Sequence, residues 1–274
     1  MDKHIAFIGA GNMAGALIRG LLADGVSPGH LTATDQSSEK CRALHTATGI
    51  RTLQDNRAAA AEADIVVLAV KPQVLRQVAM ELADQVQERR PLVISIAAGV
   101  RSSSLERWLG GDVALVRTMP NTPAMIQSGA TVLYATPRVS APQREQAESL
   151  MRAVGLTQWI KDESLMDAVT ALSGSGPAYL FLVMEAIEAA GRELGLSPET
   201  AHLLTLQTAF GAARMALESS DSPEALRMQV TSPGGTTERA VGVLEDGGIH
   251  ELFQRALEAA RDRSLELSAD LGVA

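Results

Sequence analysis

The sequence predicts an α/β domain followed by an all-helical domain. Short apolar segments alternate with helical patterns through residues 1–161, and this alternation is typical of a parallel sheet with helices on both faces. Over residues 162–274, strand signals disappear and alanine-rich segments repeat with a helical period. We therefore expect one domain over 1–161 and a second over 162–274.

The expected strands of the first domain are short and apolar, and helical patterns separate several of them. The strands cover residues 4–8, 31–34, 65–70, 92–96, 113–117 and 131–134, and the helices include 14–23, 74–87 and 103–109. In the second domain, helical patterns cover 183–190, 201–217 and 252–267. Residues 203–213 carry no charge, which favours burial either within their own domain or against another subunit.

Composition excludes several classes of function. With 46% hydrophobic and 20% charged residues, the chain is typical of an ordered globular protein. A net charge of −8 and 3% aromatic residues argue against nucleic acid as a partner. No apolar stretch reaches membrane-spanning length, no signal peptide is visible and Cys41 has no disulfide partner, so we expect a cytoplasmic protein without membrane or metal sites.

A glycine-rich motif follows the first expected strand and opens the first expected helix. It reads Gly9-Ala10-Gly11-Asn12-Met13-Ala14 and matches the GxGxx[G/A] fingerprint of Rossmann dinucleotide-binding domains. Gly9 permits the tight turn, Gly11 lets a pyrophosphate approach the backbone, and Ala14 allows the helix to pack closely on the strand. A simple glycine turn is the alternative, and the strand and helix around the motif favour the dinucleotide site.

The residue after the second expected strand bears on the choice of dinucleotide. A carboxylate at Asp35 would bind a ribose 2′-hydroxyl and repel a 2′-phosphate, which favours NADH. The neutral donors of residues 36–38, together with Lys40 and Arg42, keep NADPH open. Asp35 could instead cap the next helix.

Three further segments come at the ends of expected strands, where this fold binds ligands. They are Ala69-Val70-Lys71-Pro72, Ala97-Ala98-Gly99, and Met119-Pro120-Asn121-Thr122-Pro123, in which Asn121 could donate toward a ligand. The structural alternatives are that Pro72 only begins a helix and that Lys71 is only a solvated charge.

The second domain lacks a feature that alcohol oxidation would require. Beta-hydroxyacid dehydrogenases share a similar domain plan and use a helical lysine as the acid–base group, whereas this chain has Leu180 at that spacing and no lysine after Lys161. His202 and His250 are the remaining candidate bases, and we interpret neither as catalytic. Hydride addition to a protonated imine needs little acid–base help, so the absence favours imine reduction.

The segment 230–237 predicts an anion pocket in this second domain. Pro233, two glycines and two hydroxyl residues lie where an amphipathic helix begins. A helix start presents unpaired backbone N–H groups and the positive end of its dipole, and glycine allows close approach. We therefore expect a site for a small carboxylate.

Four motifs, in order, resemble the pyrroline-5-carboxylate reductase family. They are the glycine motif at 9–14, Ala69–Pro72 at the third strand, Ser173-Gly-Ser-Gly-Pro-Ala-Tyr179, and Val230-Thr-Ser-Pro-Gly-Gly-Thr-Thr237. The resemblance implies that NADPH, or alternatively NADH, reduces 1-pyrroline-5-carboxylate to L-proline, the last step of proline biosynthesis. It also implies a Rossmann domain followed by an all-α dimerisation domain, a homodimer, and assembly of dimers up to a decamer.

The same resemblance implies roles for individual residues. Backbone groups of Gly235, Thr236 and Thr237 would bind the substrate carboxylate, and the Thr237 hydroxyl would contact the ring nitrogen while hydride attacks C5. Glu163 would lie near the substrate, and Asn56 matches an adenosine-contacting position. The alternatives are a beta-hydroxyacid-dehydrogenase-like oxidoreductase and a non-catalytic dinucleotide-binding regulator.

Overall fold

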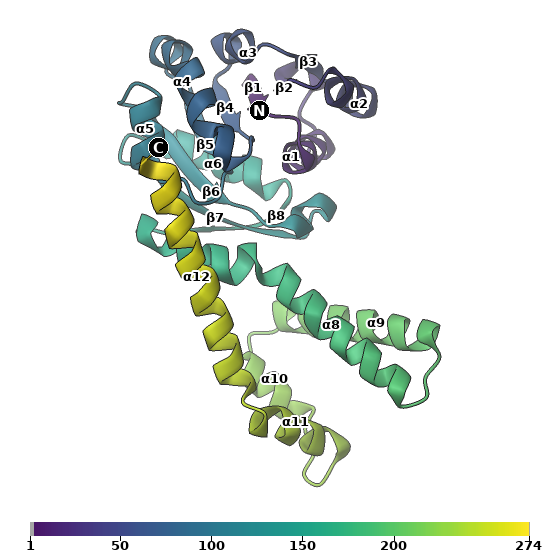
Figure 1. The fold of residues 1–274 in the computed structure, drawn as a ribbon. Coiled ribbons are helices and arrows are strands. Elements are labelled where there is room, and N and C mark those ends of the chain that lie inside the picture. Colours follow the sequence, from purple (N-terminus) through teal and green to yellow (C-terminus); the bar gives the residue numbers. More distant parts are fainter. Residues whose placement is uncertain (1–2, 274) are drawn as a thin grey trace. The chain divides into compact units, whose positions relative to one another are not determined.

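Parallel strands form the central sheet, as expected, in a computed structural model that describes residues 3–273 (Figure 1). The order is β3-β2-β1-β4-β5-β6-β7-β8, with β6/β7 as the antiparallel pair. The strands are β1 Ile5–Ile8, β2 Leu31–Thr34, β3 Arg51–Leu53, β4 Ile65–Leu68, β5 Leu92–Ser95, β6 Leu115–Met119, β7 Gly129–Ala135 and β8 Gly155–Trp159. The first six have the Rossmann order, so the predicted fold is confirmed. The sequence analysis missed β3 and β8.

Helices cover the sheet, and side-chain caps fix where several of them begin. The helices are α1 Asn12–Ala23, α2 Ser38–Thr48, α3 Asn56–Glu62, α4 Pro72–Arg89, α5 Ser102–Trp108, α6 Ala141–Arg152 and the short α7 Met166–Val169. Ser37 caps α2 by accepting a hydrogen bond from the Lys40 backbone, and Asp55 caps α3 in the same way. Ser140 and Gln143 form a reciprocal capping box at α6.

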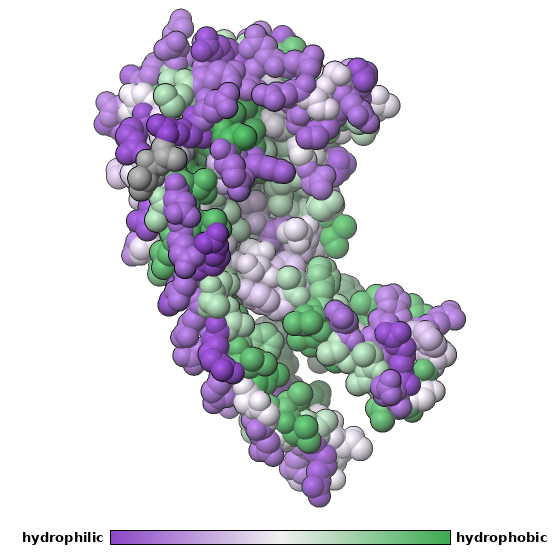
Figure 2. Space-filling model, viewed as in Figure 1, coloured by the Kyte–Doolittle hydropathy of each residue, from purple (hydrophilic) through white to green (hydrophobic). Residues whose placement is uncertain are grey.

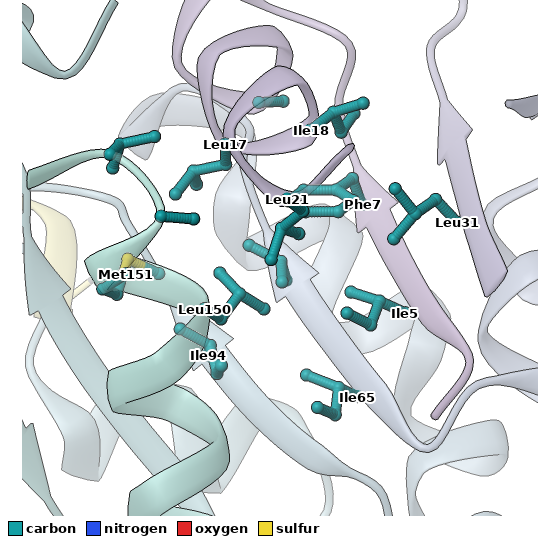
Figure 3. Close-up of a cluster of buried hydrophobic side chains, with 14 of the residues drawn as sticks. Ile5, Phe7, Leu17, Ile18, Leu21, Leu31, Ile65, Ile94, Leu150 and Met151 are labelled. Atoms are coloured by element: carbon teal, nitrogen blue, oxygen red, sulfur yellow. The ribbon is translucent and has the colours of Figure 1, made fainter. Parts of the chain in front are cut away.

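The core lies on both faces of the sheet because alternate strand residues point to opposite sides. In β1, Ile5 and Phe7 belong to one buried cluster, and Ala6 and Ile8 belong to the other. Figure 3 shows the first cluster, in which side chains of α1 lie beside Phe7, with Leu150 and Met151 of α6 nearby. This packing fixes the carboxyl ends of β1 and β4, where a Rossmann sheet binds its ligand.

The chain divides into two compact units whose limits differ from the expected domain boundary. One unit runs to Ser175 and resumes at Ala260, and the other is Gly176–Ala259. Residues 163–175 stay with the first unit because Glu163 is held by Ser102 and Arg117, two residues that precede it by more than forty positions. The end of the last helix also belongs to the first unit, where Leu271 packs against a core cluster.

Helices make up the second unit. They are α8 Gly176–Glu193, α9 Pro198–Glu218, α10 Pro223–Gln229, α11 Thr236–Asp246 and the first part of α12 Ile249–Val273. Large apolar side chains on α8 and α9 are exposed, including Phe181 at 64% and Phe210 at 60% (Figure 2). Residues 203–213 therefore leave most of their large apolar side chains exposed within their own unit. No helix of the described residues is long and apolar enough to cross a membrane.

A carboxylate on α6 gives the first unit a pH-dependent contact. The Trp159 indole N–H donates to Glu148 over 2.9 Å, and Arg152 forms an ion pair with the same carboxylate. These contacts, the Trp159 hydrogen bond foremost, lower the pKa of Glu148 below its ordinary value of 4.5. Because the folded state favours the ionised form, this stabilisation is complete above the ordinary pKa and is lost as the pH falls through the lowered pKa.

We predict that Glu148→Gln lowers the free energy of unfolding by about 0.5–1 kcal/mol at pH 7 and that this difference shrinks as the pH falls below 4.5. Urea unfolding of both proteins at several pH values measures the effect. Glu145→Gln is the matched control, since the Glu145 side chain is exposed on the same helix and forms no hydrogen bond or ion pair with the described residues. A difference that does not depend on pH would contradict the prediction.

Candidate active site

The glycine loop after β1 passes very close to β4. Gly9 has a φ of 110°, and a Cβ there would lie 2.5 Å from the Ala69 carbonyl oxygen. Both the backbone conformation and the close approach therefore require glycine. The Gly9 N–H donates to the carbonyl of Thr34 in β2. The loop is thus held between the two strands that flank β1, at the point where the strand order reverses.

The start of α1 has free donors and open space. Gly11 is the N-cap and supplies no side-chain cap, so the N–H groups of Asn12, Met13 and Ala14 have no partner among the described residues. A Cβ on Gly11 would meet nothing within 4 Å, so packing within the chain does not require glycine there. Open space over unpaired N–H groups fits a pyrophosphate. Ala14 is buried, as close packing of the helix on the strand requires.

The Asp35 side chain contacts the glycine loop that follows β1. Its carboxylate accepts hydrogen bonds from the backbone N–H of Ala10 at 3.3 Å and of Ser37 at 2.9 Å, and Lys40 Nζ lies 3.4 Å away. Ser37, and not Asp35, caps α2. The site at the end of β2 therefore presents a carboxylate and an ammonium group together, and both can meet the ribose 2′ position of a dinucleotide.

Asn56 lies beside the end of β2, as a nucleotide contact there would require. Thr34 Oγ1 donates to its Oδ1 over 2.6 Å, and its Nδ2 donates to Glu81. These two hydrogen bonds fix the orientation of the amide beside Thr34, the residue that precedes Asp35. Its contact with adenosine stays a prediction.

The ends of β4 and β5 border a cavity within the first unit. Lys71 is the N-cap residue of α4 and Pro72 its first residue, while Lys71 is exposed and has no ion pair among the described residues. Val70 is half-buried and Ala97 is buried. The cavity of about 260 Å³ is lined by Pro72, Gln73, Ala98, Gly99, Thr170, Ser175 and side chains of α12. Open α/β sheets bind their ligands outside the carboxyl ends of the strands, the same side on which Pro72 and Ala98 follow β4 and β5.

The Asn121 side chain forms hydrogen bonds with two backbone groups of the same chain. Its Nδ2 donates to the Ser173 carbonyl over 3.1 Å, and its Oδ1 accepts from the Ala130 backbone over 2.9 Å. The amide therefore ties the loop after β6 to the turn at residues 170–174, which forms a π-helix. Its expected part in cofactor binding stays a prediction beside this internal role.

Glu163, which the family resemblance places near the substrate, is the centre of a polar cluster. Sequence reasoning did not find its partners Ser102 and Arg117. Glu163 accepts from the Ser102 backbone at 2.7 Å and from Arg117 at 3.0 Å, and Arg117 is only 3% exposed. Burial and then the negative charge of Glu163 raise the pKa of Tyr134, which pairs with Arg117 across β6 and β7. An arginine within the apolar strand was the available sequence signal, since a buried charge requires a partner.

In the second unit, the segment before α11 forms a tight turn. The Gly235 N–H donates to the Ser232 carbonyl over 3.0 Å, with Pro233 and Gly234 between them. Gly234 has a φ of 71°, so the turn is of type II with proline and glycine at their preferred positions. A Cβ on Gly235 would lie 2.9 Å from the Ser232 oxygen, so glycine is required there by close approach.

Three backbone donors are free at the start of α11. Gly235 is the N-cap without a side-chain cap, and the N–H groups of Thr236, Thr237 and Glu238 have no partner among residues 3–273. The sequence analysis expected backbone groups of Gly235, Thr236 and Thr237, but the Gly235 N–H is already used in the turn. It missed Glu238, although a glutamate three residues after a helix N-cap is a known capping signal.

Comparison with known proteins decides the family. A curated pyrroline-5-carboxylate reductase of Pseudomonas aeruginosa is 51% identical over 269 residues, covering 98% of this chain and 98% of the relative. The chain belongs to the pyrroline-5-carboxylate reductase family. The family model for pyrroline-5-carboxylate reductase dimerisation matches residues 163–267, and a model described as NADP oxidoreductase, coenzyme F420-dependent, matches residues 4–99.

Solved structures agree with this membership. A pyrroline-5-carboxylate reductase from Coxiella burnetii superposes with a TM-score of 0.94 at 50% identity, covering 98% of this chain and 99% of that one. A Plasmodium falciparum pyrroline carboxylate reductase with NADP bound gives 0.86 at 29% identity, covering 97% and 98%. The predictions of a reductase of the pyrroline-5-carboxylate reductase family, of an NADP-binding domain and of a dimerisation domain are confirmed.

We predict that the Asp35–Lys40 pair sets the balance between NADPH and NADH. Asp35→Ser removes a negative charge near the 2′ position and should raise the ratio of kcat/KM for NADPH to that for NADH by about three- to tenfold. Lys40→Gln removes the positive charge and should lower this ratio. Steady-state kinetics with both dinucleotides measures it. If the two variants change the ratio in the same direction, the charge argument is wrong.

Proposed function

We propose that the chain reduces 1-pyrroline-5-carboxylate to L-proline with NADPH, in the last step of proline biosynthesis. The observation that carries this proposal is the glycine-capped start of α11, with its three unpaired N–H groups and two hydroxyl side chains. The substrate is a small ring with one carboxylate and one imine, and this segment offers donors for the first and a hydroxyl group for the second.

The dinucleotide supplies the hydride, and residues of the first unit would hold it. The free N–H groups of Asn12, Met13 and Ala14 would bind the pyrophosphate, and Gly11 leaves the space for it. Asp35 and Asn56 would contact the adenosine half. The segments at the strand ends would contact the remainder, namely Ala69, Val70, Lys71, Pro72, Ala97, Ala98 and Asn121.

The substrate carboxylate would bind at the start of α11. The N–H groups of Thr236 and Thr237 would donate to its oxygens, and the positive end of the helix dipole favours the negative charge. Gly235 leaves room for this approach because it has no side chain. The Glu238 N–H would be a third donor to the carboxylate, in addition to the backbone groups that the sequence predicted.

The Thr237 hydroxyl would orient the imine. The protonated ring nitrogen donates to the Thr237 oxygen, and hydride adds to C5, after which the nitrogen is a secondary amine. No alkoxide forms, so the reaction requires no general base to remove a proton from the reacting atom. Most of the rate gain comes from orientation. Glu163 remains proposed as a group near the substrate, with its carboxylate held in place by Arg117 and Ser102.

The proposal includes a homodimer. The second unit lies within the residues that match the dimerisation family model, and its helices α8 and α9 expose large apolar side chains. A second copy that covers these faces would remove this surface from water, which is a favourable process. Assembly of such dimers up to a decamer is a further prediction.

We predict that Thr237→Ala lowers kcat/KM for 1-pyrroline-5-carboxylate by about ten- to a hundredfold, because the imine loses the hydroxyl group that orients it. Thr237→Ser keeps the hydroxyl group and should retain most of the activity. Oxidation of NADPH in the presence of the substrate measures both variants, and thermal unfolding checks that both remain folded. Full activity of Thr237→Ala would refute the assigned role.

A further inference from the structure

The start of α11 is stabilised by an unusual side-chain contact. Several of the described helices begin after a serine or aspartate that accepts from the N–H groups of the first turn, as Ser197 does at α9 and Ser222 at α10. At α11 the N-cap is Gly235, which has no acceptor. The carboxylate of Glu238 instead accepts from the Gly234 N–H over 2.8 Å. The contact is therefore made one residue before the N-cap and leaves the N–H groups of the first helical turn free.

This hydrogen bond restrains the most flexible part of the segment. Gly234 and Gly235 are adjacent glycines, whose backbones have more conformational freedom than those of other residues, and Gly234 adopts a positive φ. Pro233 fixes its own φ, and the turn hydrogen bond joins Gly235 to Ser232. The remaining hydrogen bond connects Gly234 to the first turn of the helix through the Glu238 side chain. Glu238 thereby joins the turn to the first turn of α11. It leaves the backbone N–H groups of Thr236, Thr237 and Glu238 free to bind a ligand.

We propose that Glu238 is a positioning residue for the substrate carboxylate. It keeps the type II turn in the conformation in which the N–H groups of Thr236, Thr237 and Glu238 converge on one carboxylate. This inference rests on the proposed function, since it concerns the same helix start. When only a fraction of the free protein has the binding conformation, the apparent affinity falls by that fraction. Once the substrate is bound, its own carboxylate orders these groups, so the effect falls on KM and not on kcat.

Three substitutions distinguish the contributions of three properties of the Glu238 side chain, namely its hydrogen-bond acceptor, its negative charge and its length. Glu238→Ala removes all three. Glu238→Gln keeps an oxygen that can accept from Gly234 and removes the charge. Glu238→Asp keeps the charge on a shorter side chain, which does not reach Gly234. Glu245→Ala is the matched control, because it removes a carboxylate at the other end of α11, where Glu245 pairs with Arg227 at 3.1 Å.

The experiment measures KM and kcat for 1-pyrroline-5-carboxylate at saturating NADPH, and KM for NADPH, in the full chain. We expect Glu238→Ala and Glu238→Asp to raise KM for the substrate by about three- to tenfold, the scale of one lost intramolecular hydrogen bond. We expect kcat and the KM for NADPH to change by less than about twofold. Glu238→Gln should retain the low KM, and Glu245→Ala should match the unsubstituted protein.

Several results would overturn the positioning role. They are an unchanged substrate KM in Glu238→Ala, a Glu238→Gln variant as impaired as Glu238→Ala, or a loss confined to kcat. Thr237→Ala reports on the proposed function separately. Full activity of that variant would refute the substrate site itself, whereas a defective Thr237→Ala beside an unchanged Glu238→Ala would refute only the role of Glu238.

Discussion

Backbone N–H groups in the first turn of a helix have no partner within that helix. The candidate site depends on which helix starts have a side chain that accepts hydrogen bonds from these groups and which do not. Side chains satisfy them at α2, α3, α6, α9 and α10. At α5, the Glu163 carboxylate accepts from the first residue, Ser102. At α1 and α11 the N-cap is glycine, and the donors are left free. The two helix starts predicted to bind anionic groups thus both have a glycine N-cap and no capping side chain; among the described helices α4, with Lys71 as N-cap, also lacks one.

Carboxylates near these helix starts support loops of the chain. Asp35 accepts from Ala10 in the glycine loop, and Glu238 accepts from Gly234 in the turn before α11. Both contacts are made to backbone N–H groups just before the helix. They therefore restrain the segment that leads into the helix and leave the N–H groups of its first turn free. The acidic side chains therefore hold the backbone in the shape that an anion requires. Lys40 Nζ lies 3.4 Å from the Asp35 carboxylate, so a positive charge stands beside one of these two acidic groups.

Local sequence patterns predicted the parts of the structure that local physics determines. Apolar strands with helices between them gave the sheet, and the glycine motif marked the turn at Gly9 because steric limits there permit no other residue. The edge strands β3 and β8 were missed, since their residues are partly exposed and show no apolar run. The contact of Arg117 with Glu163 joins positions far apart in the chain, and no local pattern can pair them. The same contact keeps residues 163–175 with the first unit.

The last helix ends in the unit where the chain begins. Leu271 packs against a core cluster of the first unit, and Arg107 donates to the Gly272 carbonyl over 2.9 Å. Gly176–Ala259 is therefore an insertion with two covalent tethers to the same unit. A mechanical force applied between the two chain ends would load the first unit, and the inserted helices would stay shielded from tension until that unit opened. The chain thus protects its helical unit by topology, independently of any contact that the helices make.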